Sequence, residues 1–346
     1  MPLHADVSTR ASSHALDDCV KARHRRLVVN MAAALLLLPG LASAQDDGST
    51  GDPVPESQSG TVQAEFPEIT PPTRLWSLAF SVSNLFDDNI DHDDRSVNAY
   101  GFVYGAGAHY QTSHRRPLFQ MDYELANYTY PTAERWSRLS HYVRTSLEKR
   151  LTRRLSVEAL GQFISGGVSE EQEITNQLIF TPRVEYRLPR DHRIRFYAAH
   201  RLKRYSINTE RNATNRYVGL ELQRRLDSGD TWEIGYRYED NDADGPRYRY
   251  LRLTYETGYA TTLTRQDVLS LNVKFRSQRY RTRLVEVDDI DVPRHDQQWI
   301  PTVAWVHRFG TRMEMLMEYS VDTQSSNDLD RDYTAHSTRL SFRHLW

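Results

Sequence analysis

The part of this chain that follows residue 44 contains no cysteine. The single thiol, Cys19, lies in an amino-terminal segment that we expect to be removed. A disulfide framework, a cysteine-based metal site and a cysteine nucleophile are therefore excluded for the processed chain. An excess of one charge sign is also missing, because the formal net charge is −2. A nucleic-acid partner has no electrostatic support, and none is expected.

Long apolar runs are missing too, except near the amino end. Basic residues at positions 21–26 precede an apolar run at 27–38, and Ala42-Ser43-Ala44 then fits an A-x-A cleavage site. This order predicts a secretory signal peptide over residues 1–44. The apolar run is too short to cross a bilayer as a helix.

Lysine and arginine are absent from the next segment. Residues 45–73 are acidic and rich in Pro, Ser and Gly. Such a composition buries too little apolar surface to order itself. We therefore expect a disordered, acidic periplasmic tail over residues 45–73.

From residue 74 onward, helical periodicity gives way to alternation of apolar and polar residues. In the first such segment Trp76, Leu78, Phe80 and Val82 occupy every second position, and about fourteen segments of this kind follow one another. Side chains alternate across a strand, so each segment has one apolar face. The fold class predicted for residues 74–346 is all-β, a transmembrane antiparallel up-and-down β-barrel of about 14 strands. The alternative is a soluble all-β periplasmic protein.

The composition fits a barrel, because only every second residue of a barrel strand meets lipid. The chain is 39% hydrophobic yet contains 20 Tyr and 6 Trp, which suit the aromatic girdles at the two membrane interfaces. Short basic links alternate with longer acidic ones, which is typical of periplasmic turns and outer loops. The longest expected outer link covers residues 278–296. The location predicted is the bacterial outer membrane, with lipid and lipopolysaccharide as surroundings.

The carboxyl end of the chain closes an alternating strand with an aromatic residue. Leu340, Phe342 and Trp346 share one face, and Arg339 and Arg343 share the other. The pattern resembles the C-terminal β-signal of bacterial outer-membrane barrels, except that His344 stands where that signal has an apolar residue. This resemblance implies that the barrel-assembly machinery is a partner and reads Leu340, Phe342 and Trp346.

Charged residues gather on the non-apolar faces of the expected strands. A charged face cannot meet hydrocarbon cheaply, so these side chains should line the lumen. The proposed lumen-lining residues are Arg144, Glu148, Arg183, Glu185, Arg187, Arg195, Glu233, Arg237, Glu314, Glu318, Arg339 and Arg343. The function predicted is a porin-like channel that passes a small polar solute or exports a surface polymer. The alternative is a lumen sealed by its own ion pairs, in a non-conducting barrel that assembles or anchors a surface lipoprotein or polysaccharide partner.

Metal binding and catalysis have weaker support. A cluster of carboxylates in the first outer link could bind Ca²⁺ or Mg²⁺, although a solvated acidic surface is the preferred interpretation. Its members are Asp87, Asp88, Asp91, Asp93 and Asp94. His109, His141, His200 and His336 form no motif with a nucleophile and an orienting carboxylate, so no catalytic site, cofactor or enzymatic activity is expected.

The first expected hairpin carries a family resemblance. Residues 83–90 read Ser-Asn-Leu-Phe-Asp-Asp-Asn-Ile, followed by an acidic loop and a strand rich in Gly and Tyr. This resembles the start of the β-barrel porin 2 family, which implies a porin-like outer-membrane barrel and no particular substrate. The hairpin is also similar to that of the barrel of surface lipoprotein assembly modifiers, but the helical repeats that precede that barrel are absent here.

Overall fold

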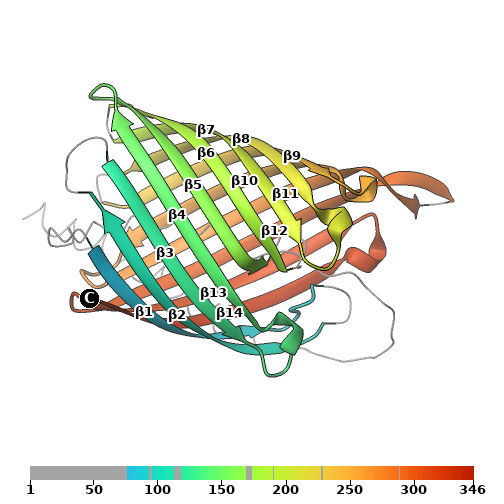
Figure 1. The fold of residues 1–346 in the computed structure, drawn as a ribbon, viewed down its shortest axis with the longest axis horizontal. Helices are drawn as coiled ribbons and strands as arrows, with labels where there is room; N and C mark the ends of the chain where they lie inside the picture. The colour runs from blue at the N-terminus through green and yellow to red at the C-terminus, as the bar shows by residue number, and fades with distance from the viewer. Residues whose placement is uncertain are drawn as a thin grey trace, which may run out of the picture. The chain divides into compact units, whose positions relative to one another are not determined.

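A computed structural model describes residues 76–92, 96–112, 118–168, 174–189, 191–226, 229–287 and 289–346. The predicted signal peptide and acidic tail lie outside these residues. Fourteen strands are present in the described part of the chain (Figure 1). They are β1 (Trp76–Asp87), β2 (Ala99–Gln111), β3 (Leu118–Thr129), β4 (Arg138–Arg150), β5 (Leu155–Val168), β6 (Ile174–Arg187), β7 (His192–Tyr205), β8 (Ala213–Arg225), β9 (Thr231–Ala243), β10 (Tyr250–Thr262), β11 (Asp267–Val287), β12 (Ile290–Phe309), β13 (Met313–Ser326) and β14 (Tyr333–Leu345).

Each strand pairs antiparallel with the next, and β1 pairs antiparallel with β14 to close the barrel. The closing ladder runs from Ala79 opposite Leu345 to Asp87 opposite Ser337. Closure leaves no sheet edge with unpaired backbone groups, which is the condition for a sheet to lie in hydrocarbon. The predicted all-β, up-and-down barrel of 14 strands is thereby confirmed.

The outer surface of the barrel is apolar because the alternation of the sequence is preserved in the strands. On β1, Trp76 is 59% exposed and Leu78 55%, whereas Ser83 on the opposite face is 2% exposed. The same exchange occurs on β6, where Leu178 and Phe180 are exposed and Gln177 is buried. An apolar exterior around a charged interior needs a lipid environment. Among the described residues, no helix has the length and hydropathy needed to cross a membrane.

The two ends of the barrel differ. Tight links such as the one between Phe309 and Met313 lie at the end where the chain terminates, which we call the inner end (Figure 1). At the opposite, outer end, short 3-10 turns follow β3, β7, β9 and β13. These turns are η1 (Glu134–Trp136), η2 (Thr209–Arg211), η3 (Pro246–Tyr248) and η4 (Leu329–Arg331).

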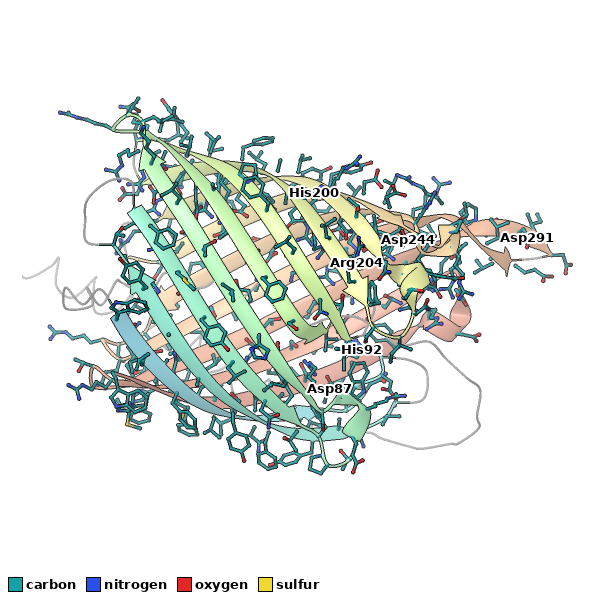
Figure 2. All side chains as sticks on the ribbon, viewed as in Figure 1. Asp87, His92, His200, Arg204, Asp244 and Asp291 are labelled. Atoms are coloured by element: carbon teal, nitrogen blue, oxygen red, sulfur yellow. The ribbon has the colours of Figure 1, made fainter. Side chains whose placement is uncertain are left out.

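The longest outer link differs from its prediction. Residues 278–296 were expected to form a loop, but β11 and β12 continue through them as a hairpin that projects from the barrel, with Asp291 near its tip (Figures 1 and 2). Val285 pairs with Val292, and Val287 pairs with Ile290. These β-branched residues favour the strand conformation and extend the pairing beyond the barrel. The register shifts between Arg279 and Leu284, at the base of the hairpin.

The first outer connection folds inward. Asn89, Ile90, Asp91 and His92 are all buried, although they follow the last residue of β1. Ile90 packs in a cluster with Ala99, Tyr130, Trp136 and Val168. Burying this apolar residue against two aromatic rings holds the connection in the outer mouth of the barrel.

Candidate functional site: the charged lumen

The inward faces of the strands form the candidate site. All twelve residues proposed to line the lumen lie on strand faces opposite the exposed apolar residues. Arg144 on β4 and the four residues on β13 and β14 border an internal cavity. Glu148 and the residues on β6, β7 and β9 take part in ion pairs or lie beside them. The structure therefore does not bring the twelve together into one site, but divides them between two regions.

The inner part of β6–β8 contains a chain of ion pairs. Arg195 Nη1 donates to Glu221 Oε2 at 2.8 Å, and Arg195 Nη2 lies 3.3 Å from Glu185 Oε2. Arg187 Nε donates to the other oxygen of Glu185 at 2.9 Å. Both glutamates are at least half-buried, so salt screens these ion pairs less than it screens surface pairs. On this part of the lumen wall, the charged side chains therefore pair with one another.

A second set of charges lies between β4, β5 and β6. Arg183 Nη1 lies 3.5 Å from Glu158 Oε2. Glu158 is the register partner of Glu148, so two carboxylates share this stretch of wall. Glu233 lies near the inner end of β9, opposite Gln223.

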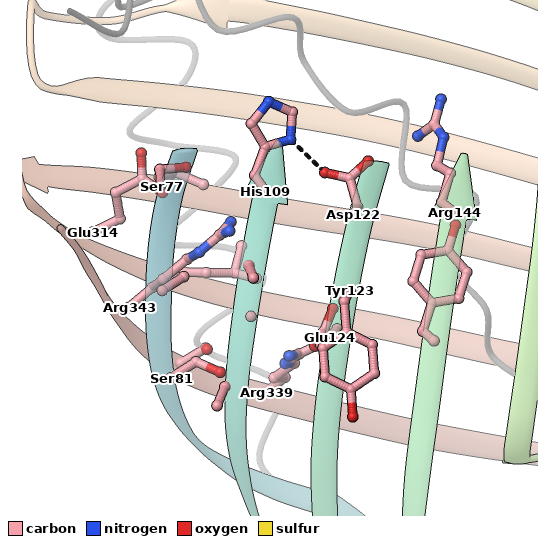
Figure 3. Close-up of a pocket in the computed structure, with 18 of the residues that line it drawn as sticks. Ser77, Ser81, His109, Asp122, Tyr123, Glu124, Arg144, Glu314, Arg339 and Arg343 are labelled. Carbon is pink, nitrogen blue, oxygen red and sulfur yellow. Dashed lines mark hydrogen bonds and ion pairs between the residues drawn. The ribbon is translucent and has the colours of Figure 1, made fainter. Parts of the chain in front are cut away.

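A cavity of about 580 Å³ occupies the inner half of the lumen. Apart from His109 on β2, its charged lining comes from two groups of strands, β3–β4 and β13–β14 (Figure 3). The charged side chains are His109, Asp122, Glu124, Arg144, Glu314, Glu318, Arg339 and Arg343. A volume of this size lies within the range of small-molecule sites.

The cavity exists because the strands between these two groups have small inward side chains. Ser77, Ala79 and Ser81 face inward from β1, and Gly105 and Gly107 face inward from β2. A methyl group added to Gly105 would come within 2.5 Å of Ser81 Oγ. Larger residues on β1 and β2 would fill the cavity.

A histidine–carboxylate pair that the sequence analysis did not predict borders the cavity. His109 Nδ1 and Asp122 Oδ1 are 2.6 Å apart across β2 and β3 (Figure 3). The sequence analysis did not anticipate this pair because it depends on register, which places the two residues opposite each other. Ser77 is the partner of His109 on β1, yet in the described part of the chain no hydroxyl forms a hydrogen bond with this ring. Within the described residues, the pair therefore has no serine-type nucleophile hydrogen-bonded to it.

A buried network missed by the sequence analysis surrounds Glu239, which is 0% exposed. Its carboxylate accepts hydrogen bonds from Arg201 Nη2 at 2.8 Å, Asn215 Nδ2 at 2.7 Å and Tyr250 Oη at 3.3 Å, with Arg237 Nε and Arg252 Nη1 each 3.8 Å away. Three guanidinium groups thus share one carboxylate. These residues lie toward the outer ends of β7–β10, so the network narrows the outer half of the lumen.

The network continues along the wall to the first outer connection. Arg276 Nη1 donates to Gln298 Oε1 at 3.1 Å, and Gln298 Nε2 donates to Asp322 at 2.9 Å. His92 Nδ1 lies 3.5 Å from Asp322 Oδ2, and His92 Nε2 lies 3.9 Å from Asp87 Oδ2. Burial lowers the pKa of His92, but the neighbouring carboxylates of Asp87 and Asp322 outweigh burial and raise it above its usual 6.5. We use the name outer belt for the polar residues of these two paragraphs, which are Arg201, Asn215, Arg237, Glu239, Tyr250, Arg252, Arg276, Gln298, Asp322 and His92.

The acidic cluster of the first connection is engaged with protein partners. Asp91 Oδ1 accepts a hydrogen bond from Trp136 Nε1 at 3.0 Å and also contacts Arg135. Asp88 Oδ1 accepts one from the backbone N–H of His336 at 2.6 Å. Asp93 and Asp94 lie outside the described residues. Within those residues, no group of three or more side chains has the arrangement of a metal site.

The proposed assembly signal lies on the lipid-facing surface. Leu340, Phe342 and Trp346 are exposed. Trp346 follows β14 and exchanges two backbone hydrogen bonds with Leu78. His344 shares this face, with its ring centroid 4.1 Å from that of Trp346.

The comparisons with known proteins support the fold. No protein-family model and no curated protein matches this sequence. The solved structure of outer-membrane expressed OmpT of Vibrio cholerae is 10% identical and has a TM-score of 0.50, covering 78% of this chain and 97% of that one. An anion-selective porin from Comamonas acidovorans is 8% identical with a TM-score of 0.48, covering 78% and 98%.

Pseudomonas aeruginosa OprD is 10% identical, with a TM-score of 0.40 and coverage of 78% and 95%. Of these three structures, the one with a TM-score of 0.50 supports the fold, and its 10% identity supports nothing more specific. The resemblance of the first hairpin to a particular family therefore stays a prediction. With its closed antiparallel sheet and apolar exterior, the chain has the fold of a bacterial outer-membrane β-barrel, and the outer membrane is the location that this fold implies.

Proposed function

We propose that this barrel is an outer-membrane channel that passes a small polar solute. One observation carries the proposal: the inner half of the lumen holds a cavity of about 580 Å³ bordered by charged side chains. Charged groups facing an aqueous cavity attract or repel ions before they enter a constriction. The outer belt supplies that constriction. A porin-like role also agrees with the resemblance of the first hairpin to the β-barrel porin 2 family, which we retain as part of this proposal.

Arg339 and Arg343 provide the direct test of conduction through the cavity. Changing both to Gln removes two positive charges from its wall, so the pore should become more selective for cations. Planar bilayer recordings of the purified protein in a KCl gradient measure this as a shift of the reversal potential. We expect resolved conductance steps for both proteins and a reversal potential displaced toward the K⁺ equilibrium value in the variant.

The matched control removes two positive charges outside the cavity. Arg247 and Arg281 lie at the outer end, in exposed ion pairs with Glu210 and Asp240. Changing both to Gln should leave the reversal potential close to that of the unmodified protein, because salt screens exposed charges within about 10 Å. Absence of conductance steps from correctly folded protein would overturn the proposal. A reversal potential that moves equally in both variants would exclude the cavity as the ion path.

A second function is favoured by the projecting hairpin of β11 and β12. Leu284 and Ile290, which the register places on opposite faces of this hairpin, are 53% and 63% exposed. Apolar side chains beyond the barrel rim can contact another macromolecule. In this alternative the barrel does not conduct, and it anchors a surface lipoprotein or polysaccharide. Silent bilayers combined with loss of a surface polymer on deletion of residues 281–292 would favour it.

A further inference from the structure

The inner cavity contains charged groups of both signs that form no side-chain hydrogen bond or ion pair with the described residues. Among the described residues, neither a side-chain hydrogen bond nor an ion pair involves Arg144, Arg343, Glu124 or Glu318. Arg339 has only a 3.4 Å hydrogen bond to Ser83 Oγ, and its Nε is buried without a partner. These groups contrast with the outer belt, where Arg201, Arg237 and Arg252 all lie within 4 Å of the Glu239 carboxylate.

The lack of pairing is notable because register places opposite charges side by side. Arg343 is the partner of Glu314 on the neighbouring strand, and Arg339 is the partner of Glu318. Adjacent strands are about 4.8 Å apart, so these side chains could reach each other. Glu314 instead accepts a hydrogen bond from Arg308 Nε at 3.2 Å. The guanidinium groups of Arg339 and Arg343 are thus left facing the cavity.

The arrangement of these charges defines two banks. Glu124 and Arg144 belong to the β3–β4 bank, and Glu318, Arg339 and Arg343 belong to the β13–β14 bank (Figure 3). Between them lies the floor of Ser, Ala and Gly on β1 and β2. Each bank offers both a carboxylate and a guanidinium, so neither bank is suited to a solute of one sign only.

We propose that the inner cavity binds a small zwitterion of dipeptide size, which places its carboxylate against an arginine of one bank and its ammonium against a glutamate of the other. This inference rests on the proposed channel function and names its class of solute. From β3 to β14 there are three strand spacings, or roughly 14 Å at about 4.8 Å each. Arginine and glutamate side chains shorten the gap, and a dipeptide, at about 3.5 Å per residue, is long enough to bridge the remainder.

Solutes of a single charge suit the cavity less well. An anion would be attracted by the arginines but repelled by Glu124 and Glu318. A cation would be attracted by these glutamates but repelled by the arginines. A neutral solute would leave both sets of charges without partners, and unmet charged groups are costly where water is restricted. The charge pattern therefore favours a solute that carries both a positive and a negative group over a solute of equal size that carries one charge or none.

Four compounds of nearly equal size test this discrimination. Glycylglycine is the zwitterion, N-acetylglycinamide is neutral, N-acetylglycine is the anion and glycylglycinamide is the cation. Calorimetric titration of the processed, full-length protein in detergent should give the tightest binding for glycylglycine. The expected advantage over N-acetylglycinamide is about tenfold, the size of one charge-assisted hydrogen bond.

Two variants on different banks locate the site. Glu124→Gln and Arg343→Gln should each reduce glycylglycine affinity about tenfold while leaving the weak binding of N-acetylglycinamide unchanged. Glu210→Gln and Arg247→Gln alter an exposed ion pair outside the cavity and serve as matched controls. They should change neither the affinity for glycylglycine nor that for N-acetylglycinamide. Heat-modifiable migration on gels shows which variants are folded. Because the two cavity variants lie on distant parts of the chain, misfolding of one still leaves the other as a test.

The outcomes separate this inference from the channel proposal. Conductance with equal affinity for all four compounds would overturn the zwitterion site and leave the channel standing. Tight glycylglycine binding without conductance would do the reverse. Preference for N-acetylglycine would replace the zwitterion by an anion as the solute class. Unchanged glycylglycine affinity in both Glu124→Gln and Arg343→Gln would place the binding elsewhere in the protein.

Discussion

Replacing Glu239 by Gln tests whether the outer belt is held together by charge. The substitution keeps the shape of the side chain and its Oε1 acceptor, so packing should change little. It removes the negative charge that Arg201 Nη2, at 2.8 Å, shares with Arg237 and Arg252, each at 3.8 Å. Because Glu239 is 0% exposed, water cannot replace the lost charge.

The expected loss follows from this burial. Removing one partner of a buried ion pair costs about 3–5 kcal/mol, because the remaining charge is left uncompensated. Gln can still accept the hydrogen bonds of Arg201 and Asn215, so we expect the lower limit, about 3 kcal/mol. At about 1.4 kcal/mol per factor of ten, the unfolding equilibrium constant should rise roughly a hundredfold.

Urea unfolding in lipid vesicles, followed by tryptophan fluorescence, measures this loss as a lower midpoint. Glu210→Gln is the matched control, because Glu210 and Arg247 form an ion pair at 3.6 Å with side chains 62% and 61% exposed. An exposed pair contributes about 0–1 kcal/mol. If Glu239→Gln cost no more than Glu210→Gln, the reasoning that treats the belt as a desolvated network would be refuted.

Three further substitutions probe other parts of the barrel. Trp346→Ser should lower the yield of inserted barrel, because the assembly machinery is expected to read that side chain; an unchanged fraction of heat-modifiable protein in outer membranes would contradict this. The raised pKa of His92 means that its stabilising charge is fully present below about pH 6.5 and is lost as the pH rises through the higher folded-state value. Hydrogen exchange of the first connection should accordingly increase with pH beyond the intrinsic rate, and His92→Gln should abolish that excess. Gly219→Ala should destabilise the barrel by about 1–3 kcal/mol, because the added methyl group overlaps the ring of Tyr197; Gly235→Ala, whose nearest neighbours are 3.8 Å away, should cost much less in the same urea assay.

The barrel could be predicted from the sequence because its main determinant is local. Each strand can be recognised by apolar residues at every second position, such as Trp76, Leu78 and Phe80 on β1. This period extends over the whole outer surface because that surface faces lipid. The even number of strands is the one expected for a bacterial single-chain barrel. No knowledge of contacts between distant residues is needed for any of these steps.

The hairpin of β11 and β12 was missed because it obeys a different rule. Beyond the barrel rim neither face meets lipid, so the strands carry charges and Pro293 among their β-branched residues. The pairs Val285–Val292 and Val287–Ile290 were the available signal. The inward fold of the first connection had a similar signal in Ile90, a lone apolar residue within an acidic segment that is buried against Trp136.

The candidate site could be predicted only as a set of inward charges, because its geometry depends on register. Arg201 and Glu239 are separated by β8 and by 38 positions in the chain, and a shift of two residues on either strand would separate them without altering any face. The same holds for His109 and Asp122. Which residues lie on the inward face of a strand can be read from the local sequence. Which of them contact one another depends on how the strands are paired, and the local sequence does not give that.

Register also explains how one charged lumen accommodates both interpretations that the sequence left open. Near the outer ends of β7–β10, acids and bases coincide in height, and the belt closes through its own ion pairs. Near the inner ends of β1 and β2, Ser, Ala and Gly keep the neighbouring charges apart, and Arg343 and Glu124 face open space. In a channel built this way, the belt limits the conductance and the cavity selects the solute. Loosening the belt with Glu239→Gln should therefore raise conductance without changing the preference among the four probe compounds, whereas Glu124→Gln should change the preference alone.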